Sequence, residues 1–178
     1  MSGNLTSTEL KRLHREWRRR TDGRLSVGID GAQGPFNVGS IIRSAAAYRA
    51  EHLWLTETAT GPDNPKVGKT ALGTDRFLDV ERVPDAAALA DAARAAGYRV
   101  IGVELAQGAR PLHEIDLRGD VCLVVGHEDR GLSKAGLAAC DALGFLPQLG
   151  SVGSLNVATA ASIAMYEWAR QQWSPTAS

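Results

Sequence analysis

The chain has 178 residues, a little more than the roughly 150 residues of a common domain. Twenty Lys and Arg balance twenty Asp and Glu, so the formal charge is zero and the chain is not a polycation that holds nucleic acid by bulk charge. Its 44% hydrophobic and 22% charged residues are typical of a globular protein and exclude wholesale disorder. We therefore expect one hydrophobic core with a short appendage.

Cysteine usage and the N-terminal sequence bear on the cellular compartment. Cys122 and Cys140 are too few for a disulfide framework and are not spaced as zinc ligands, so we expect free thiols and no metal. The N-terminus is polar and then basic, without the apolar stretch of a secretory signal. The most apolar long segment, 155–168, is interrupted by polar residues and falls short of the roughly 20 apolar residues of a membrane span. These features predict a cytoplasmic protein without a membrane partner.

The first predicted element is a helix that begins after Thr6. Thr6 and Glu9 form a capping-box pattern, and apolar residues follow at helical spacing at Leu10, Leu13 and Trp17. The other positions of this segment concentrate basic charge at Lys11, Arg12, Arg15, Arg18, Arg19 and Arg20. Such a helix either is solvated or contacts RNA, and its tryptophan either docks the helix or stacks on a base.

The rest of the chain predicts alternating strands and helices. Strands are expected at 25–29, 52–56, 99–105, 121–125 and 144–149, and helices at 37–48, at 86–96 and after residue 156. The Gly- and Pro-punctuated stretch 58–74 is expected to be an irregular connection with a turn of helix. Because 121–125 is apolar throughout, it resembles a parallel strand covered on both faces. The pattern predicts an α/β fold, mostly a parallel sheet with helices on both faces.

Three glycine-containing loops follow predicted strands, at 30–35, 126–131 and 150–156. Ligands of parallel sheets bind outside the carboxyl ends of the strands, where glycine lets a backbone come close. Each loop also carries polar side chains. We therefore expect a ligand site at this edge of the sheet.

Three motifs follow one another along the chain. They are Asn37-Val38-Gly39-Ser40-Ile41-Ile42-Arg43, then Gly126-His127-Glu128-Asp129-Arg130-Gly131-Leu132, then Leu146-Pro147-Gln148 with Ser154-Leu155-Asn156-Val157-Ala158. In order and spacing they resemble the motifs of the SpoU/TrmH class of SPOUT RNA ribose methyltransferases. The resemblance runs from about Leu25 to Trp168, and three motifs in the right order are far more specific than any one of them.

The resemblance implies an enzyme that uses S-adenosyl-L-methionine (SAM) to methylate a ribose 2′-hydroxyl in RNA, with tRNA preferred over rRNA. It also implies a C-terminal trefoil knot, and a homodimer with the active site near the subunit interface. On this reading, residues 1–24 are a basic helical extension, 25–173 the SPOUT methyltransferase domain and 174–178 a tail.

The resemblance assigns Arg43 as the catalytic arginine, although a lone arginine is usually a surface residue. Because a guanidinium stays protonated, we expect it to fix a phosphate and to stabilise a developing alkoxide. We expect Asn37 to orient Arg43 or the ribose, with a plain helix N-cap as the alternative. Glu128 is expected to accept hydrogen bonds from the partner arginine or the RNA ribose, and the alternative is a turn-stabilising role.

Ser154 and Asn156 are expected to offer a hydroxyl and an amide to the ribose or the cofactor, or else to cap the last helix. SAM in this family is held mostly by backbone groups, with the adenine between apolar side chains. The matching positions are Glu104, Leu105, Gly126, Leu146 and Leu155, for each of which ordinary packing is the alternative.

Three positions depart from many relatives, which carry a small or polar residue at His127, Gly at Asp129 and Met at Gln148. We expect His127 to serve its turn rather than catalysis, and Arg130 either to touch a phosphate or to be an ordinary surface charge. We expect these departures to affect how the cofactor fits.

Two rival functions come from other classes. A non-catalytic RNA-binding protein on the same scaffold is disfavoured by the retained polar motif residues. A nucleotide-dependent oxidoreductase is disfavoured because no Gly-x-Gly-x-x-Gly turn follows the first strand.

Overall fold

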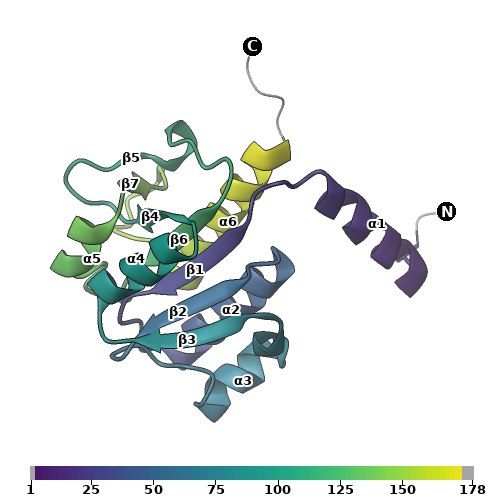
Figure 1. Ribbon diagram of the computed structural model, residues 1–178, viewed down its shortest axis with the longest axis horizontal. Coiled ribbons are helices and arrows are strands. Elements are labelled where there is room, and N and C mark those ends of the chain that lie inside the picture. Colours follow the sequence, from purple (N-terminus) through teal and green to yellow (C-terminus); the bar gives the residue numbers. More distant parts are fainter. Residues whose placement is uncertain (1–2, 174–178) are drawn as a thin grey trace.

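Seven parallel strands form one sheet in the computed structural model, which describes residues 3–173 (Figure 1). The expected tail at 174–178 lies outside the described residues. In chain order the strands are β1 Leu25–Ile29, β2 His52–Thr56, β3 Asp79–Val83, β4 Arg99–Val103, β5 Arg110–Pro111, β6 Val121–Val125 and β7 Ala142–Phe145. Their order in the sheet is β3-β2-β1-β6-β4-β7-β5. The predicted α/β class and parallel sheet are confirmed.

Helices cover both faces of the sheet, as predicted. The helices are α1 Ser7–Arg19, α2 Pro35–Ala47, α3 Pro65–Ala71, α4 Ala86–Ala95, α5 Lys134–Ala139 and α6 Val157–Trp173, with 3₁₀ turns at Thr74–Phe77 and Leu112–Glu114. One apolar cluster joins α2, α3 and α6 to one face, and a second joins α4 and α5 to the other (Figure 1). Every residue of β1 and β6 is buried, because these central strands are covered on both sides.

The second helix begins earlier than the sequence suggested. It starts at Pro35, whose fixed φ and missing N–H suit the first helical position, and Gly34 is its N-cap residue. Asn37 therefore stands inside the first turn, and the alternative reading of this residue as a helix N-cap is wrong.

Strand β7 is displaced from the expected range of 144–149. Its register with β4, in which Ile101 pairs with Ala142 and Val103 with Gly144, sets the start of the strand at Ala142. The chain leaves the sheet after Phe145, shortly before Pro147, which has no N–H to donate to a neighbouring strand. β4 likewise ends at Val103 rather than at 105.

Several short elements escaped the sequence pattern. The turn of helix predicted within 58–74 is the seven-residue helix α3, whereas β3, β5 and α5 were not predicted. β3 and β5 lie at the two edges of the sheet, where strands are only half covered and carry little apolar pattern.

Helix α1 projects from the body of the molecule (Figure 1). The predicted capping box is present, since the Thr6 hydroxyl accepts from the Glu9 amide while the Glu9 carboxylate accepts from the Thr6 amide. None of its residues is buried. It meets the body where the Trp17 ring lies 4.7 Å from the ring of Trp173, whose indole N–H donates to Thr21.

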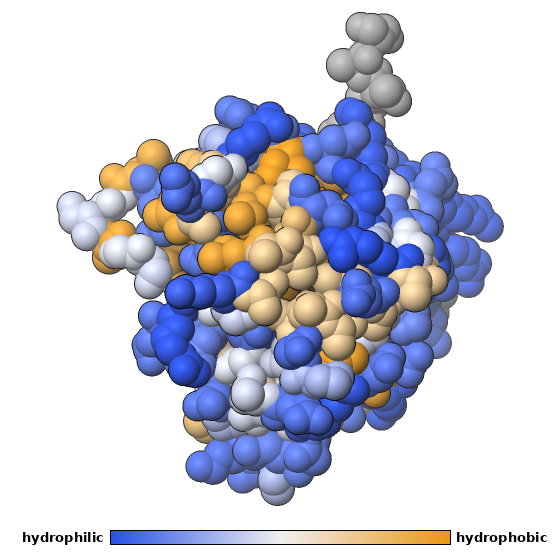
Figure 2. Space-filling model, turned by 60° about the vertical axis from the view of Figure 1, so that its left-hand side comes forward, coloured by the Kyte–Doolittle hydropathy of each residue, from blue (hydrophilic) through white to orange (hydrophobic). Residues whose placement is uncertain are grey.

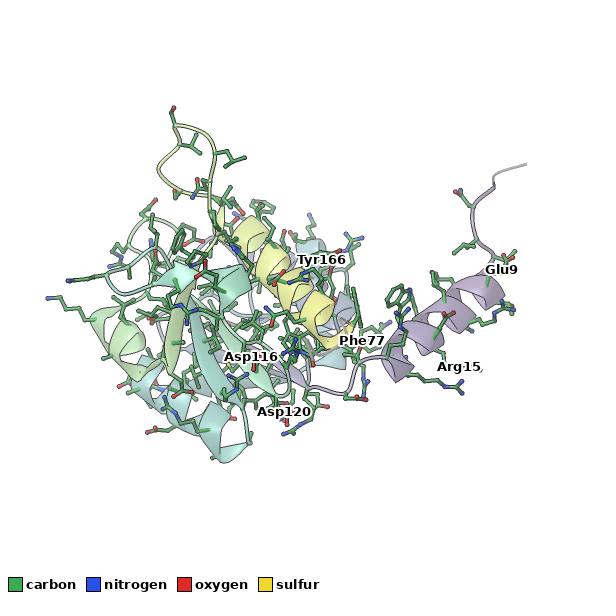
Figure 3. The ribbon with its side chains drawn as sticks, turned by 90° about the horizontal axis from the view of Figure 1, so that it is seen from above. Glu9, Arg15, Phe77, Asp116, Asp120 and Tyr166 are labelled. Carbon is green, nitrogen blue, oxygen red and sulfur yellow. The ribbon has the colours of Figure 1, made fainter. Side chains whose placement is uncertain are left out.

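The segment between β7 and α6 also stands away from the body (Figures 2 and 3). At its tip Leu149 is fully exposed and Val152 is 66% exposed. Among residues 3–173, none of the helices combines the length and the apolar character that crossing a bilayer requires.

Candidate functional site

A cavity of about 280 Å³ opens at the carboxyl ends of β4, β6 and β7. Its walls come from three segments, 103–105, 125–131 and 145–160. Two of the three predicted loops, 126–131 and 150–156, contribute to it, whereas the loop at 30–35 does not line it. All five residues expected to hold a cofactor line it, namely Glu104, Leu105, Gly126, Leu146 and Leu155. Ordinary core packing does not account for Leu105, which is 65% exposed.

Gly126 is at this position because the far side of its own turn, at Gly131 and Leu132, lies directly against it. A Cβ placed on Gly126 would lie 2.1 Å from the carbonyl carbon of Gly131 and 2.2 Å from the amide nitrogen of Leu132. Backbone atoms cannot move aside as a flexible side chain can, so any side chain here would displace the cavity wall. His127 and Gly131 hold the same turn closed by exchanging two backbone hydrogen bonds of 2.9 Å.

Glu104 ties two segments of the cavity together. One carboxylate oxygen accepts from the Leu132 amide at 3.0 Å, and the other accepts from the Leu105 amide at 3.1 Å. These bonds make Glu104 a positioning residue for the turn beside it.

Glu128, Asn37 and Asn156 are joined by a chain of side-chain hydrogen bonds. The Asn37 amide nitrogen donates to Glu128 Oε1 at 3.1 Å, and the Asn156 amide nitrogen donates to Asn37 Oδ1 at 2.8 Å. The three residues come from three different motifs and are 91 and 119 positions apart along the chain. Tertiary folding therefore brings the three motifs to one point beside the cavity.

Glu128 also binds the loop that precedes α2. Its two carboxylate oxygens accept from the backbone amides of Gly34 at 2.8 Å and Gln33 at 3.2 Å. Burial by itself would raise the pKa of the Glu128 carboxyl, but the hydrogen bonds from Asn37 and these amides lower it below the ordinary value. Within the chain, the carboxylate thus anchors the loop before α2, rather than stabilising its own turn as the alternative prediction had it.

Asn156 caps the last helix while it contacts Asn37. Its Oδ1 accepts from the amides of Ala158 at 3.0 Å and Thr159 at 3.2 Å, which satisfies donors that the first turn of α6 leaves free. Ser154 does not cap the helix, and it lines the cavity with an exposed side chain.

His127 contributes to its own turn, as expected. Its Nδ1 accepts from the Asp129 amide at 3.1 Å. Arg130 lines the cavity with an exposed side chain, where it is placed to meet an anion.

Arg43 stands apart from this cluster. It is exposed on α2, does not line the cavity and, among residues 3–173, forms no hydrogen bond or ion pair. The single chain therefore unites Asn37, Glu128 and Asn156 but does not bring Arg43 to them.

Two neighbours of the site were given no role by the sequence analysis, although Gln148 was noted there as a departure from relatives. Asp30 is 7% exposed, and its Oδ2 accepts from the Ser133 amide at 2.8 Å, which joins the loop after β1 to the start of α5. Gln148 lines the cavity, and its side-chain oxygen is buried without a hydrogen-bond partner. The position of Asp30 directly after a buried strand was the available signal, and for Gln148 it was the departure from methionine.

The charge of the cavity suits a cation. Glu104, Glu128 and Asp129 line it against the one guanidinium of Arg130, which leaves a formal excess of two negative charges. A sulfonium is attracted to such a site, and the apolar side chains of Phe145, Leu146 and Leu155 suit a planar base. The residues present therefore fit SAM. No group of three or more His, Cys, Asp or Glu placed to hold a metal occurs among the described residues.

The family model and the curated relatives that match this chain point to the same family. The sequence model of the SpoU rRNA Methylase family matches residues 24–166. The 23S rRNA (guanosine-2'-O-)-methyltransferase RlmB of Coxiella burnetii is 33% identical over 150 residues, which are 84% of this chain and 60% of that protein. The chain spans 54–60% of the length of the first curated relatives it matches.

Solved structures agree with this result. The SpoU methyltransferase AviRb from Streptomyces viridochromogenes, in complex with the cofactor AdoMet, superposes with a TM-score of 0.76 at 35% identity over 84% of this chain and 61% of that one. A structure described as giving insights into 2-OH methylation of C/U34 on tRNA has a TM-score of 0.74 at 31% identity, covering 84% of this chain and 96% of that one. Because the family match spans most of the chain and includes all three segments around the cavity, the chain belongs to the SpoU rRNA Methylase family.

Proposed function

We propose that the protein transfers a methyl group from SAM to a ribose 2′-hydroxyl of RNA. The observation that carries this proposal is the junction of the three family motifs beside a cavity with excess negative charge. Relatives support it, since AviRb binds AdoMet, which is SAM, and RlmB is a guanosine-2'-O-methyltransferase.

SAM supplies an electrophilic methyl group on a cationic sulfur. The residues of the chain then have to position the ribose oxygen in line with that group and to stabilise its developing charge. We assign Glu104, Leu105, Gly126, Leu146 and Leu155 to cofactor binding, and Asn37, Glu128, Ser154 and Asn156 to the rim that meets the ribose. Arg43 fixes the adjacent phosphate and stabilises the alkoxide, while water or a phosphate oxygen takes the proton.

A homodimer would bring Arg43 to a cavity. In the single chain Arg43 is exposed and does not line the cavity. Helices α2 and α6 lie side by side through the 2.8 Å contact between the Ser44 and Ser162 hydroxyls. They expose Phe36, Ile163 and Tyr166, which are 64%, 42% and 50% exposed, so this face suits a second copy of the chain. Arg43 would then act on the cavity of the partner subunit.

Helix α1 is the proposed RNA contact outside the cavity. Its basic residues outnumber its acidic ones, and the whole helix is exposed. Trp17 has a docking role against Trp173 and is still 37% exposed. We accordingly divide the protein into an extension at 1–24 and a methyltransferase domain at 25–173.

Three finer features belong to the same proposal. The return of the chain from β7 to α6, next to the segments that form the cavity, is where a C-terminal trefoil knot would form. The match covers 96% of the solved structure whose description names 2-OH methylation of C/U34 on tRNA. This near-complete overlap favours tRNA over rRNA as the substrate. The proposed reaction needs both SAM and RNA, which favours a cytoplasmic location for the protein.

The decisive test is incubation with labelled SAM and total RNA, followed by nuclease mapping of the modified nucleotide. We expect label at one ribose 2′-oxygen in the tRNA fraction. Transfer to rRNA would correct the substrate, while binding of RNA without any transfer would establish a non-catalytic RNA-binding protein.

The Arg43→Ala variant tests the role of the arginine. We expect methyl transfer to fall by at least about a hundredfold, as when an oxyanion donor is removed, with SAM affinity nearly unchanged by calorimetry. Turnover equal to the wild type would refute the assignment.

A further inference from the structure

A groove of about 680 Å³ lies between α1 and the body of the molecule. One wall is the second half of α1, and the other is formed by the ends of α2 and α6 with the 3₁₀ turn at Thr74–Phe77. Figure 3 shows Phe77 on the side of the body from which α1 projects. The groove shares no lining residue with the cavity at the carboxyl ends of the strands. Its volume is in the range of small-molecule sites, so it has room for a nucleotide.

Aromatic rings stand on both walls of this groove. Trp17 on α1 remains 37% exposed although it packs on Trp173, and Phe77 on the body is 61% exposed. The Arg76 guanidinium lies 4.8 Å from the centre of the Phe77 ring. Exposed aromatic rings beside guanidinium groups are typical of surfaces on which unpaired RNA bases stack.

The groove also carries cations that have no partner within the chain. Arg18 and Arg49 line it with exposed side chains, and neither side chain forms a hydrogen bond or ion pair among residues 3–173. Arg24, by contrast, is paired with Asp120 and Glu51. The lining has three arginines against two carboxylates, a formal excess of one positive charge, whereas the cavity that suits SAM has an excess of negative charge. The groove therefore suits an anionic ligand.

The backbone of Arg49 is in a conformation that arginine does not prefer. Its φ is +57°, in the left-handed region, directly after the C-cap residue Tyr48 of α2. Glycine usually occupies this position, because it has no Cβ to be strained. The Arg49 amide donates to the Ala46 carbonyl at 3.1 Å, a bond that glycine would make equally well. Neither the backbone nor a contact within the chain accounts for the guanidinium, which favours a role toward a ligand.

We infer that the groove between α1 and the body binds an unpaired nucleotide of RNA, with the base against Phe77 and the phosphate on Arg49. The inference rests on the proposed function and adds to it a substrate-binding site outside the cavity. RNA fits both features of the groove, because each nucleotide presents a flat base and an anionic phosphate. A second copy of the chain would instead have to pair the arginines that it buries there.

Binding of an adenylate hexamer, an RNA probe without base pairs, tests this site by tryptophan fluorescence at several salt concentrations. Three of the four tryptophans line the groove, so a base that stacks there changes their emission. We expect Arg49→Gly to reduce the salt slope of log K by about 0.7, as for one phosphate of a single strand, and to keep or raise thermal stability. Phe77→Ala should weaken binding by at least about fivefold with the slope unchanged, because it removes stacking but no charge.

Leu72→Gly is the matched control for the backbone change, since Leu72 is also exposed, has a φ of +54° and does not line the groove. Arg118→Ala controls for the loss of an exposed charge elsewhere. Both variants should bind the hexamer as the wild type does, and thermal unfolding checks that every variant is folded.

Wild-type affinity and salt slope in either groove variant, or no binding of the hexamer by the wild type, would overturn the inference. Methyl transfer to total RNA by the wild type shows in each case whether the proposed function stands. A Phe77→Ala variant that changes the oligomeric state in sedimentation and leaves RNA binding intact would make the groove an interface between subunits instead.

Discussion

Glu128 illustrates how a single side chain holds the site together. Its carboxylate accepts from Asn37 and from the backbone amides of Gln33 and Gly34, so one charge anchors both the loop after β1 and the first turn of α2. Since charge-assisted hydrogen bonds are stronger than neutral ones, ionisation of Glu128 stabilises the folded state.

The pH dependence of stability follows from the direction of the pKa shift. Because the folded state lowers the pKa of Glu128 below its ordinary value of 4.5, the stabilisation is fully present above about pH 4.5 and is lost as the pH falls through the folded-state pKa. We expect Glu128→Gln to lower the free energy of unfolding by about 1–2 kcal/mol at neutral pH, with the difference from wild type shrinking toward acid. Urea unfolding of both proteins from pH 3 to 7 measures this. A difference that stays constant over that range would contradict the assigned charge.

At the scale of elements, α1 is the part of the molecule whose role is least determined by packing. A capping box at its start stabilises the helix, yet its apolar residues Leu10 and Leu13 are 43% and 37% exposed. The contacts of Trp17 and Thr21 with Trp173 attach only its last turn and the residues that follow. A helix held in this way is free to present its basic side chains to a long polyanion.

Charge reversal in the middle of α1 tests RNA contact without disturbing that attachment. We expect Arg12→Glu with Arg15→Glu to weaken tRNA binding and to reduce the salt slope of log K by about 1.4–1.8 if both arginines contact phosphate. Filter binding at several salt concentrations gives the slope. The double variant Arg118→Glu, Lys134→Glu reverses two exposed charges outside α1 and serves as the control. If the two double variants have equal slopes, α1 is a structural element rather than an RNA contact.

For the whole molecule, the central question is whether Arg43 serves its own cavity or that of a partner subunit. Arg43→Ala leaves the cavity intact, while Gly126→Ala retains Arg43 and displaces the cavity wall. In a two-fold dimer that exchanges Arg43, half of the sites in each mixed dimer would be complete.

Mixing the two inactive variants before refolding measures this exchange. We expect about a quarter of wild-type methyl transfer, because half of the dimers are mixed and half of their sites are complete. Each variant alone should remain inactive, and thermal unfolding should show that Gly126→Ala is folded. An inactive mixture that nevertheless contains mixed dimers would mean that Arg43 acts within its own chain.

Much of the fold was readable from local pattern. The β1, β2 and β6 strands, the capping box of α1 and the run of alanines in α4 follow from side-chain periodicity and capping chemistry, which depend on near neighbours in the chain. The family motifs also indicated which loops matter, because glycines and polar residues at the ends of buried strands are distinctive.

Only the tertiary structure decided how those loops meet. The link from Asn156 through Asn37 to Glu128 and the bond from the Leu132 amide to the Glu104 carboxylate each join segments that are distant in sequence. The position of β7 depended likewise on its register with β4 rather than on its own residues. Local sequence sets the preferences of a segment, but the partner of a hydrogen bond or the closeness of two backbones is fixed by packing, and that is why the site had to be seen folded.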